Sequence, residues 1–173
     1  KRAGSEMDDD IVRDIRKKYN LIIGTNMAES CKIEVGCVKI PKEEKTFKVK
    51  GRDAVTGMPK FVEVGYADIK QAVEETAMGI VGAIKDVLEQ TPPELIGDIY
   101  SDGIILTGGL AKLTGLAKLI SEETKIKVRV HKTPQDCVIM GCGAAIAYMA
   151  EADKAAAGNF EGKGGLSPLL AAY

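Results

Sequence analysis

Residues 103–111 read GIILTGGLA, and this stretch decides the fold that the sequence predicts. The uninterrupted apolar run at 104–106 is typical of a strand buried on both faces. Two glycines follow the strand, and glycine lets the backbone turn sharply and lets a ligand approach the main chain. In open α/β sheets, ligands bind at such strand ends, where the next helix presents free N–H groups. A glycine pair also fits a plain tight turn, so both interpretations stay open at this point.

The composition is that of an ordinary globular protein and argues against several function classes. The 173 residues are 45% hydrophobic and 28% charged, with a formal net charge of −1. This balance argues against a nucleic-acid partner. No apolar run reaches the roughly 18 residues that would span a bilayer. We therefore expect a cytoplasmic protein with no nucleic-acid partner and no direct membrane segment.

The cysteines predict free thiols rather than a metal site. The chain contains no CxxC pair and only one histidine, so zinc is not expected. Reduced, partly buried thiols in a cytosolic protein are the better interpretation. The four residues concerned are Cys31, Cys37, Cys137 and Cys142.

Residues 5–19 are predicted to form a helix, because apolar side chains recur at a spacing of four and acidic residues crowd the first turns. A short apolar link at 21–23 leads to a second helix that starts after Asn26. Asn26 and Glu29 stand three apart, the offset of a capping box. Glu29 and Lys32 lie one turn apart and predict a solvated ion pair.

Alternating apolar and polar residues from 46 to 64 predict two antiparallel strands joined by turn signals at 51–59. Basic side chains gather in this part of the chain. Solvated edge lysines that discourage aggregation explain them best, and a binding patch is the alternative. They are Lys39, Lys42, Lys45, Lys48, Lys50 and Arg52.

Residues 67–90 carry an apolar stripe over six helical turns, interrupted by Gly79 and Gly82, which predict close packing. Prolines end this helix and start a short helical turn at 93–95.

Beyond the central strand, Thr114 is expected to cap a helix through Glu123. A strand at 126–130 and a last helix at 141–152 follow. Residues 153–173 lose periodicity, which predicts a flexible tail.

Several stretches together resemble the C-terminal half of bacterial actins of the MreB family. They are AGSEMD at 3–8, AESCKIEVG at 28–36, KGRDAVTGMP at 50–59, TPPEL at 91–95, GIILTGG at 103–109 and PQDCVIMGCG at 134–143. The resemblance runs in unbroken order over residues 1–150, so it is specific at family level. Leu110 in place of a third glycine, and a chain that runs on past the last helix, favour the magnetosome branch of the family.

The resemblance implies an α/β chain with a partial actin/ribonuclease-H-like ATPase fold, in which two lobes clasp a nucleotide. This chain would supply most of the second lobe. Residues 1–20 would be the linking helix of the inner subdomain, and 21–100 the complete outer subdomain. Residues 101–152 would form an incomplete inner subdomain with the glycine turn, and 153–173 the tail.

The family binds ATP or ADP between these subdomains, and eight positions match its nucleotide contacts. The resemblance assigns Glu29 to the ribose and Lys32 to the adenine, which replaces the solvated ion pair as our interpretation of these two residues. Leu110 removes backbone freedom from the turn, so we expect the adenosine side of the site rather than its phosphate side. The matching residues are Gly4, Arg16, Glu29, Lys32, Gly108, Gly109, Leu110 and Ala111.

The phosphate loops, the Mg²⁺-binding aspartate and the water-activating acid of the family have no match in this chain. The resemblance therefore assigns Mg²⁺ to a missing N-terminal lobe, which is an expected partner. We assign no catalytic residue and no metal ligand here, and we expect no ATPase activity from this chain alone. The strand at 104–106 would also keep one unpaired edge, which invites association.

The expected function is part of an ATP-binding, filament-forming cytoskeletal protein whose copies contact one another head to tail. Residues 51–60 and 93–99 are the candidate contacts. Two alternatives remain: half of a sugar-kinase-like phosphotransferase, and a non-hydrolysing module that decorates filaments.

Overall fold

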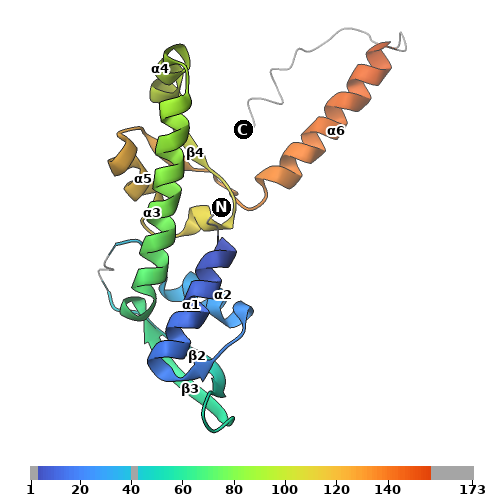
Figure 1. Cartoon of the computed structure of the whole chain (residues 1–173). Helices are drawn as coiled ribbons and strands as arrows, with labels where there is room; N and C mark the ends of the chain where they lie inside the picture. Colours follow the sequence, from blue (N-terminus) through green and yellow to red (C-terminus); the bar gives the residue numbers. More distant parts are fainter. Residues whose placement is uncertain (1–3, 40–42, 157–173) are drawn as a thin grey trace. The chain divides into compact units, whose positions relative to one another are not determined.

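The computed structural model of the chain describes residues 4–39 and 43–156, and the side chains of these as far as Glu151. The chain divides into two units between Pro134 and Gln135. We describe each unit by itself (Figure 1).

Helix α1 (Gly4–Tyr19) confirms the first predicted helix. Met7, Ile11 and Ile15 of its apolar stripe are fully buried. They share one core with α2 (Thr25–Val35) and the long helix α3 (Tyr66–Gln90), both of which α1 contacts. The stripe therefore does what its spacing predicts, which is to anchor the helix by apolar burial.

A three-stranded antiparallel sheet packs on this core. The strands are β1 (Leu21–Ile22), β2 (Thr46–Asp53) and β3 (Pro59–Gly65), in the order β1-β2-β3. The predicted pair of strands is confirmed as β2 and β3. The predicted link at 21–23 is wrong, because residues 21 and 22 pair with residues 52 and 53 of β2. Two residues carry no periodicity, so only the contact with β2 makes them a strand.

Helix α3 matches its predicted range, but close packing at its glycines is not what the structure shows. Gly79 is exposed, and a Cβ placed on Gly82 would meet no atom within 4 Å.

The helical turn predicted at 93–95 is shorter than the helix in the structure. Pro93 starts a helix of ten residues, α4 (Pro93–Asp102), which ends at Gly103 with φ +83°.

Strands β4 (Ile104–Leu106) and β5 (Val128–Val130) form a parallel pair with the predicted residues at its centre. The prediction that residues 104–106 are buried on both faces is wrong, since Ile105 is 47% exposed. Among the described residues β4 pairs with β5 alone, so one edge and part of its surface stay open.

The 3₁₀ helix η1 (Gly109–Lys112) follows β4 directly, and α5 (Leu116–Thr124) follows η1. The predicted cap at Thr114 is wrong, because α5 begins after Gly115, whose φ of +89° turns the chain. Thr114 instead forms an isolated bridge with Cys37, and its carbonyl accepts the N–H of Val38 at 2.9 Å.

The second unit contains α6 (Cys137–Ala156), which starts four residues before the predicted last helix. Several of its apolar side chains are exposed, including Val138, Ile139 and Ile146. No helix in the described part of the chain is long and apolar enough to cross a membrane. Residues 157–173, most of the predicted tail, lie outside the described residues.

The turn between β2 and β3 depends on Asp53. One carboxylate oxygen, Oδ1, accepts the N–H groups of Val55 and Thr56, each at 2.9 Å. The other, Oδ2, accepts from Lys60 Nζ at 3.0 Å. The Thr56 bond and then the Lys60 bond hold the pKa of Asp53 well below its usual range.

We expect Asp53→Asn to lower the melting temperature at pH 7, because the ionised carboxylate is the form that these donors favour. A lowered pKa in the folded state stabilises above the unfolded pKa of about 3.9, and this stability is lost as the pH falls through the folded value. Circular-dichroism melts from pH 7 to pH 3 should therefore show the difference from the parent shrinking with acid. Asp86→Asn, at an exposed position on α3, is the control. A difference that stays constant over this range would contradict the assignment.

Candidate functional site

The side chain of Lys32 joins α2 to the first turns of α1. Its Nζ lies 2.8 Å from Asp8 Oδ1, an ion contact whose angles do not make a hydrogen bond, and it donates to Asp8 Oδ2 at 2.9 Å. It also donates to the carbonyl of Gly4 at 3.2 Å. The side chains of Lys32 and Asp8 are each 12% exposed. The structure thus brings two predicted site residues, Gly4 and Lys32, together through Asp8.

Glu29 lies on the exposed surface of α2, one turn before Lys32. The predicted Glu29–Lys32 ion pair is wrong, because in the described part of the chain the ammonium pairs with Asp8. The predicted capping box is also wrong, since α2 starts at Thr25 after Gly24 and has no side-chain cap bond. The Glu29 carboxylate is therefore exposed and does not pair with Lys32.

Sequence reasoning missed Asp8. Burial raises the pKa of its carboxyl group, while the hydrogen bond and charge of Lys32 oppose this effect. The charges of Glu29 and Asp9 add to the raised pKa. Its position directly after Met7, a buried residue of the α1 stripe, was the available signal, because such a residue lies at the edge of the buried face.

The glycine turn has one position that requires glycine. Gly108 adopts φ +82°, a conformation that L side chains rarely take. Its carbonyl accepts the N–H of Ala111 at 3.2 Å, which starts η1. Leu110 has no positive φ and packs against the core. The backbone of the turn therefore does not require glycine at position 110, and the expected effect of Leu110 on the phosphate side stays a prediction.

The turn and the helix that carries Lys32 are joined by direct contacts. Gly36, which ends α2, leaves no room for a side chain, since a Cβ there would lie 2.2 Å from the carbonyl oxygen of Lys32. The same Cβ would lie 3.3 Å from a methyl of Leu113, the residue after η1. With the Cys37–Thr114 bridge, this close approach places the segment that directly follows the glycine turn against the end of α2.

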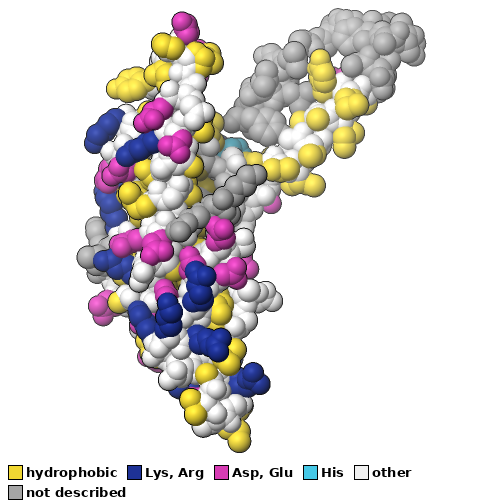
Figure 2. Space-filling view, viewed as in Figure 1, with side chains coloured by type: hydrophobic (Ala, Val, Ile, Leu, Met, Phe, Trp, Pro, Cys, Tyr) yellow, Lys and Arg dark blue, Asp and Glu magenta, His cyan; other side chains and the backbone are white. Residues whose placement is uncertain are grey.

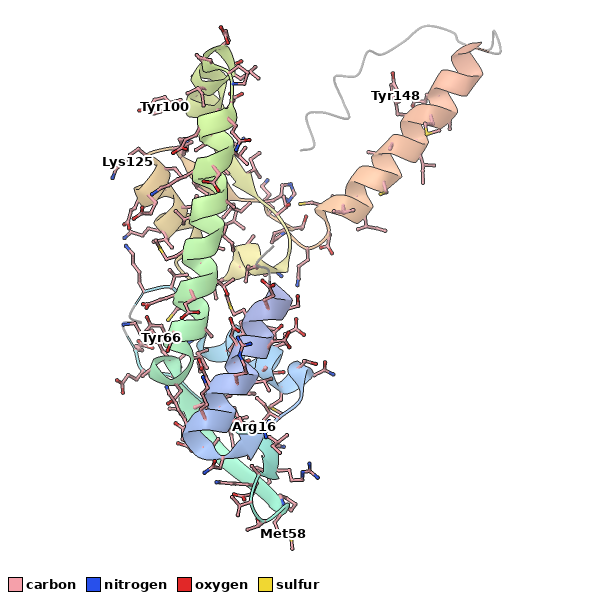
Figure 3. The ribbon with its side chains drawn as sticks, in the orientation of Figure 1. Arg16, Met58, Tyr66, Tyr100, Lys125 and Tyr148 are labelled. Atoms are coloured by element: carbon pink, nitrogen blue, oxygen red, sulfur yellow. The ribbon has the colours of Figure 1, made fainter. Side chains whose placement is uncertain are left out.

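Arg16 is not brought to this cluster. It is exposed on the last turn of α1, twelve residues after Gly4 in the chain, which is about 18 Å along a helix. Figure 3 shows it at the end of α1 that lies toward the sheet. Gly4 and Lys32 are thus in contact, and Arg16 lies away from both.

An open pocket of about 340 Å³ lies beyond the C-terminal end of α2. It contains none of the predicted site residues. Its lining residues include Val35, Gly36, Cys37, Lys45, Tyr66 and Thr114.

All four thiols of the chain are free, as predicted, and burial raises the pKa of Cys31 to about 12. Among the described residues, no group of three or more His, Cys, Asp or Glu could hold a metal ion.

Gly108 allows a test of the turn with a matched control. Gly108→Ala should lower the free energy of unfolding by about 1–2 kcal/mol, because alanine must adopt a left-handed φ there while its Cβ meets no atom within 4 Å. Gly82→Ala adds the same methyl in equally open space within α3 and should raise stability by up to about 1 kcal/mol. Urea unfolding of both variants measures the two effects. Equal effects of the two substitutions would contradict the conformational assignment of Gly108.

Comparisons with known proteins find matches over most of the chain. The family model "MreB/Mbl protein" matches residues 1–154. The cell shape-determining protein Mbl of Bacillus subtilis (strain 168) is 42% identical over 143 residues, which cover 83% of this chain and 43% of the relative. The cell shape-determining protein MreB of Escherichia coli (strain K12) is 38% identical over 144 residues, covering 83% and 42%. The chain thus spans less than half the length of these relatives.

Solved structures resemble this one over most of its length. MreB 5 of Spiroplasma citri bound to AMPPNP has a TM-score of 0.82 at 30% identity, covering 90% of this chain and 47% of that one. The MamK double helical filament has a TM-score of 0.61 at 21% identity, covering 78% and 41%. This second likeness supports the fold alone. The family match, together with the sequence identity to Mbl and the likeness to the MreB 5 structure, shows that the chain belongs to the MreB/Mbl family and has part of an actin-like fold.

Proposed function

We propose that the chain is the C-terminal part of an ATP-binding, filament-forming cytoskeletal protein of the cytoplasm. The observation that supports this proposal is that Lys32 contacts Gly4 while the end of its helix contacts the segment that follows the glycine turn at 108–111. Structures of the related MreB 5 with ADP and with AMPPNP support nucleotide as the ligand. We assign this region to the adenosine half of the nucleotide.

The chemistry of the residues fits an adenosine. The exposed carboxylate of Glu29 can accept hydrogen bonds from ribose hydroxyls, and Lys32 lies one turn along the same helix. Gly108 and Gly109 are exposed, and the space beside Gly108 is open, so a ligand can approach the backbone. We assign the phosphates and Mg²⁺ to residues outside this chain, and the bound metal would there stabilise charge on the phosphates.

The first unit also carries two surfaces suited to head-to-tail contact. The hairpin tip (residues 54–58) exposes Val55 and Met58, and exposed basic residues of β2 lie nearby. The Nζ of one of these, Lys48, lies 5.2 Å from the centre of the Phe61 ring. Figure 2 shows the yellow and dark blue side chains at this end of the molecule.

Helix α4 has the complementary character. Its charged residues are all acidic and exposed, and two large apolar side chains, Leu95 and Tyr100, are more than half exposed. The acidic residues are Glu94, Asp98 and Asp102. Within the first unit, α4 and the hairpin lie at opposite ends of α3 (Figure 1). A basic apolar surface at one end and an acidic apolar surface at the other suit a heterologous contact that repeats along a filament.

Family membership favours the cytoskeletal role over half of a sugar-kinase-like phosphotransferase. A non-hydrolysing module that decorates filaments differs from our proposal in needing no nucleotide, so binding measurements separate the two. The magnetosome role stays a prediction.

The nucleotide assignment is tested by Lys32→Ala in the full-length gene product. We expect ATP affinity to fall by several-fold or more, the scale of one lost charge-assisted contact. Calorimetric titration with AMPPNP measures it without turnover. Lys70→Ala, an exposed lysine of α3 that pairs with Glu74, is the control and should bind as the parent does. Unchanged affinity in the Lys32 variant would overturn the assignment.

The filament contact is tested by Arg52→Glu. We expect a higher critical concentration for assembly, because reversing a charge opposite an acidic surface replaces attraction with repulsion. Pelleting over a range of protein concentrations measures this, and circular dichroism should show an unchanged fold. Lys17→Glu reverses an exposed charge on α1 and should leave the critical concentration as it is. Normal polymers from the Arg52 variant would move the contact elsewhere.

A further inference from the structure

The ammonium of Lys32 is held by two hydrogen bonds to the first turns of α1. A lysine ammonium has three N–H donors. One is directed to the Gly4 carbonyl and one to Asp8 Oδ2, and Asp8 Oδ1 is the nearest oxygen at 2.8 Å. In each of the six other ion pairs found between described side chains, at least one partner is more than a third exposed, whereas both partners here are 12% exposed.

The geometry leads us to propose that Asp8 is a positioning residue, which fixes Lys32 so that its side chain is held in one orientation for the ligand. This inference rests on the proposed function, in which Lys32 contacts adenosine. Lysine carries about 2 kcal/mol of rotamer entropy. Asp8 and Gly4 already restrict the rotamers of Lys32 in the chain without ligand, so less of this entropy is lost when the ligand binds.

The ion pair between Asp8 and Lys32 contributes little to the stability of the fold. Burial raises the pKa of its carboxyl group despite the ammonium beside it, so removing the carboxylate from water offsets much of the attraction. Glu29 and Asp9 also oppose its ionised form. Removing Asp8 alone leaves the Lys32 ammonium without its charged partner, so the effects of Asp8 on folding and on binding are measured separately on the same variants.

The hydrogen bond and the ion contact of Asp8 both go to Lys32, so we expect its main effect on a ligand to pass through that side chain. Asp8 is 8% exposed, whereas Glu29 on α2 is exposed, so a ligand in solvent meets the Glu29 carboxylate rather than the Asp8 carboxylate. Met7 on one side of it is fully buried in the core, which fixes the backbone that carries Asp8. Asp9 on the other side is exposed and supplies a matched control on the same turn.

The test is a double-mutant cycle in the full-length gene product, with AMPPNP as the probe in calorimetric titration. The variants are Asp8→Asn, Lys32→Met, the double variant and Asp9→Asn. Asp8→Asn should weaken binding by about fivefold or more, the scale of one charge-assisted contact, whereas Asp9→Asn should bind as the parent does. In the Lys32→Met background, Asp8→Asn should weaken binding no further, because Asp8 acts through Lys32.

Melting temperatures measured on the same variants separate positioning from folding. Lys32→Met leaves a buried carboxylate unpaired and should lower the melting temperature, which the double variant should recover. A loss of affinity in Asp8→Asn that is equal in both backgrounds, or that follows the melting temperature, would overturn the positioning role. So would parent-like affinity in Asp8→Asn while Lys32→Ala binds weakly. A parent protein that does not bind AMPPNP would instead overturn the proposed function.

Discussion

The first unit depends on burial of the apolar stripe of α1. Met7, Ile11 and Ile15 are fully buried against residues of α2, α3 and the sheet. Full burial of such side chains contributes about 1.5–3 kcal/mol each, so these three anchor the helix far more strongly than its surface charges do. The stripe also sets where Asp8 lies. Because Met7 must face the core, the next residue is held at the edge of that core, within reach of Lys32.

A second constraint connects the end of α2 with the segment that follows η1. A Cβ on Gly36, at the end of α2, would lie 2.2 Å from the carbonyl oxygen of Lys32 and 3.3 Å from a methyl of Leu113, which follows η1. The bridge between Cys37 and Thr114 closes the same junction. Two segments almost 80 residues apart in the chain are thereby fixed against each other, and with them Lys32 and the glycine turn. A ligand between such parts meets groups that need little rearrangement, which reduces the entropy lost on binding.

Several large apolar side chains of the described residues are exposed. Ile105 of β4 is 47% exposed, and α6 exposes Val138, Ile139 and Met149. Exposed apolar patches mark interaction sites in folded proteins. The chain spans less than half the length of the relatives it matches, so exposed apolar residues here are consistent with a fold that is only in part contained in these 173 residues.

The sequence by itself determined the elements whose signal is local. The spacing of four in α1, the six-turn stripe of α3, the alternation in β2 and β3, and the glycines after β4 each reflect a backbone period or a φ that one residue type permits. The family resemblance and the part of the fold it covers were also available from sequence, because motifs in order along the chain need no contact between them.

The tertiary structure alone decided which distant groups meet. Strand β1 exists because residues 21 and 22 reach β2, and α5 starts late because Thr114 pairs with Cys37. Lys32 pairs with Asp8, 24 residues away, rather than with Glu29 on its own helix. Helical spacing brings Glu29 and Lys32 to the same face, but the free energy of an ion pair also depends on its burial and on the other oxygens within reach. Those quantities follow from packing between elements, which no spacing along the chain encodes.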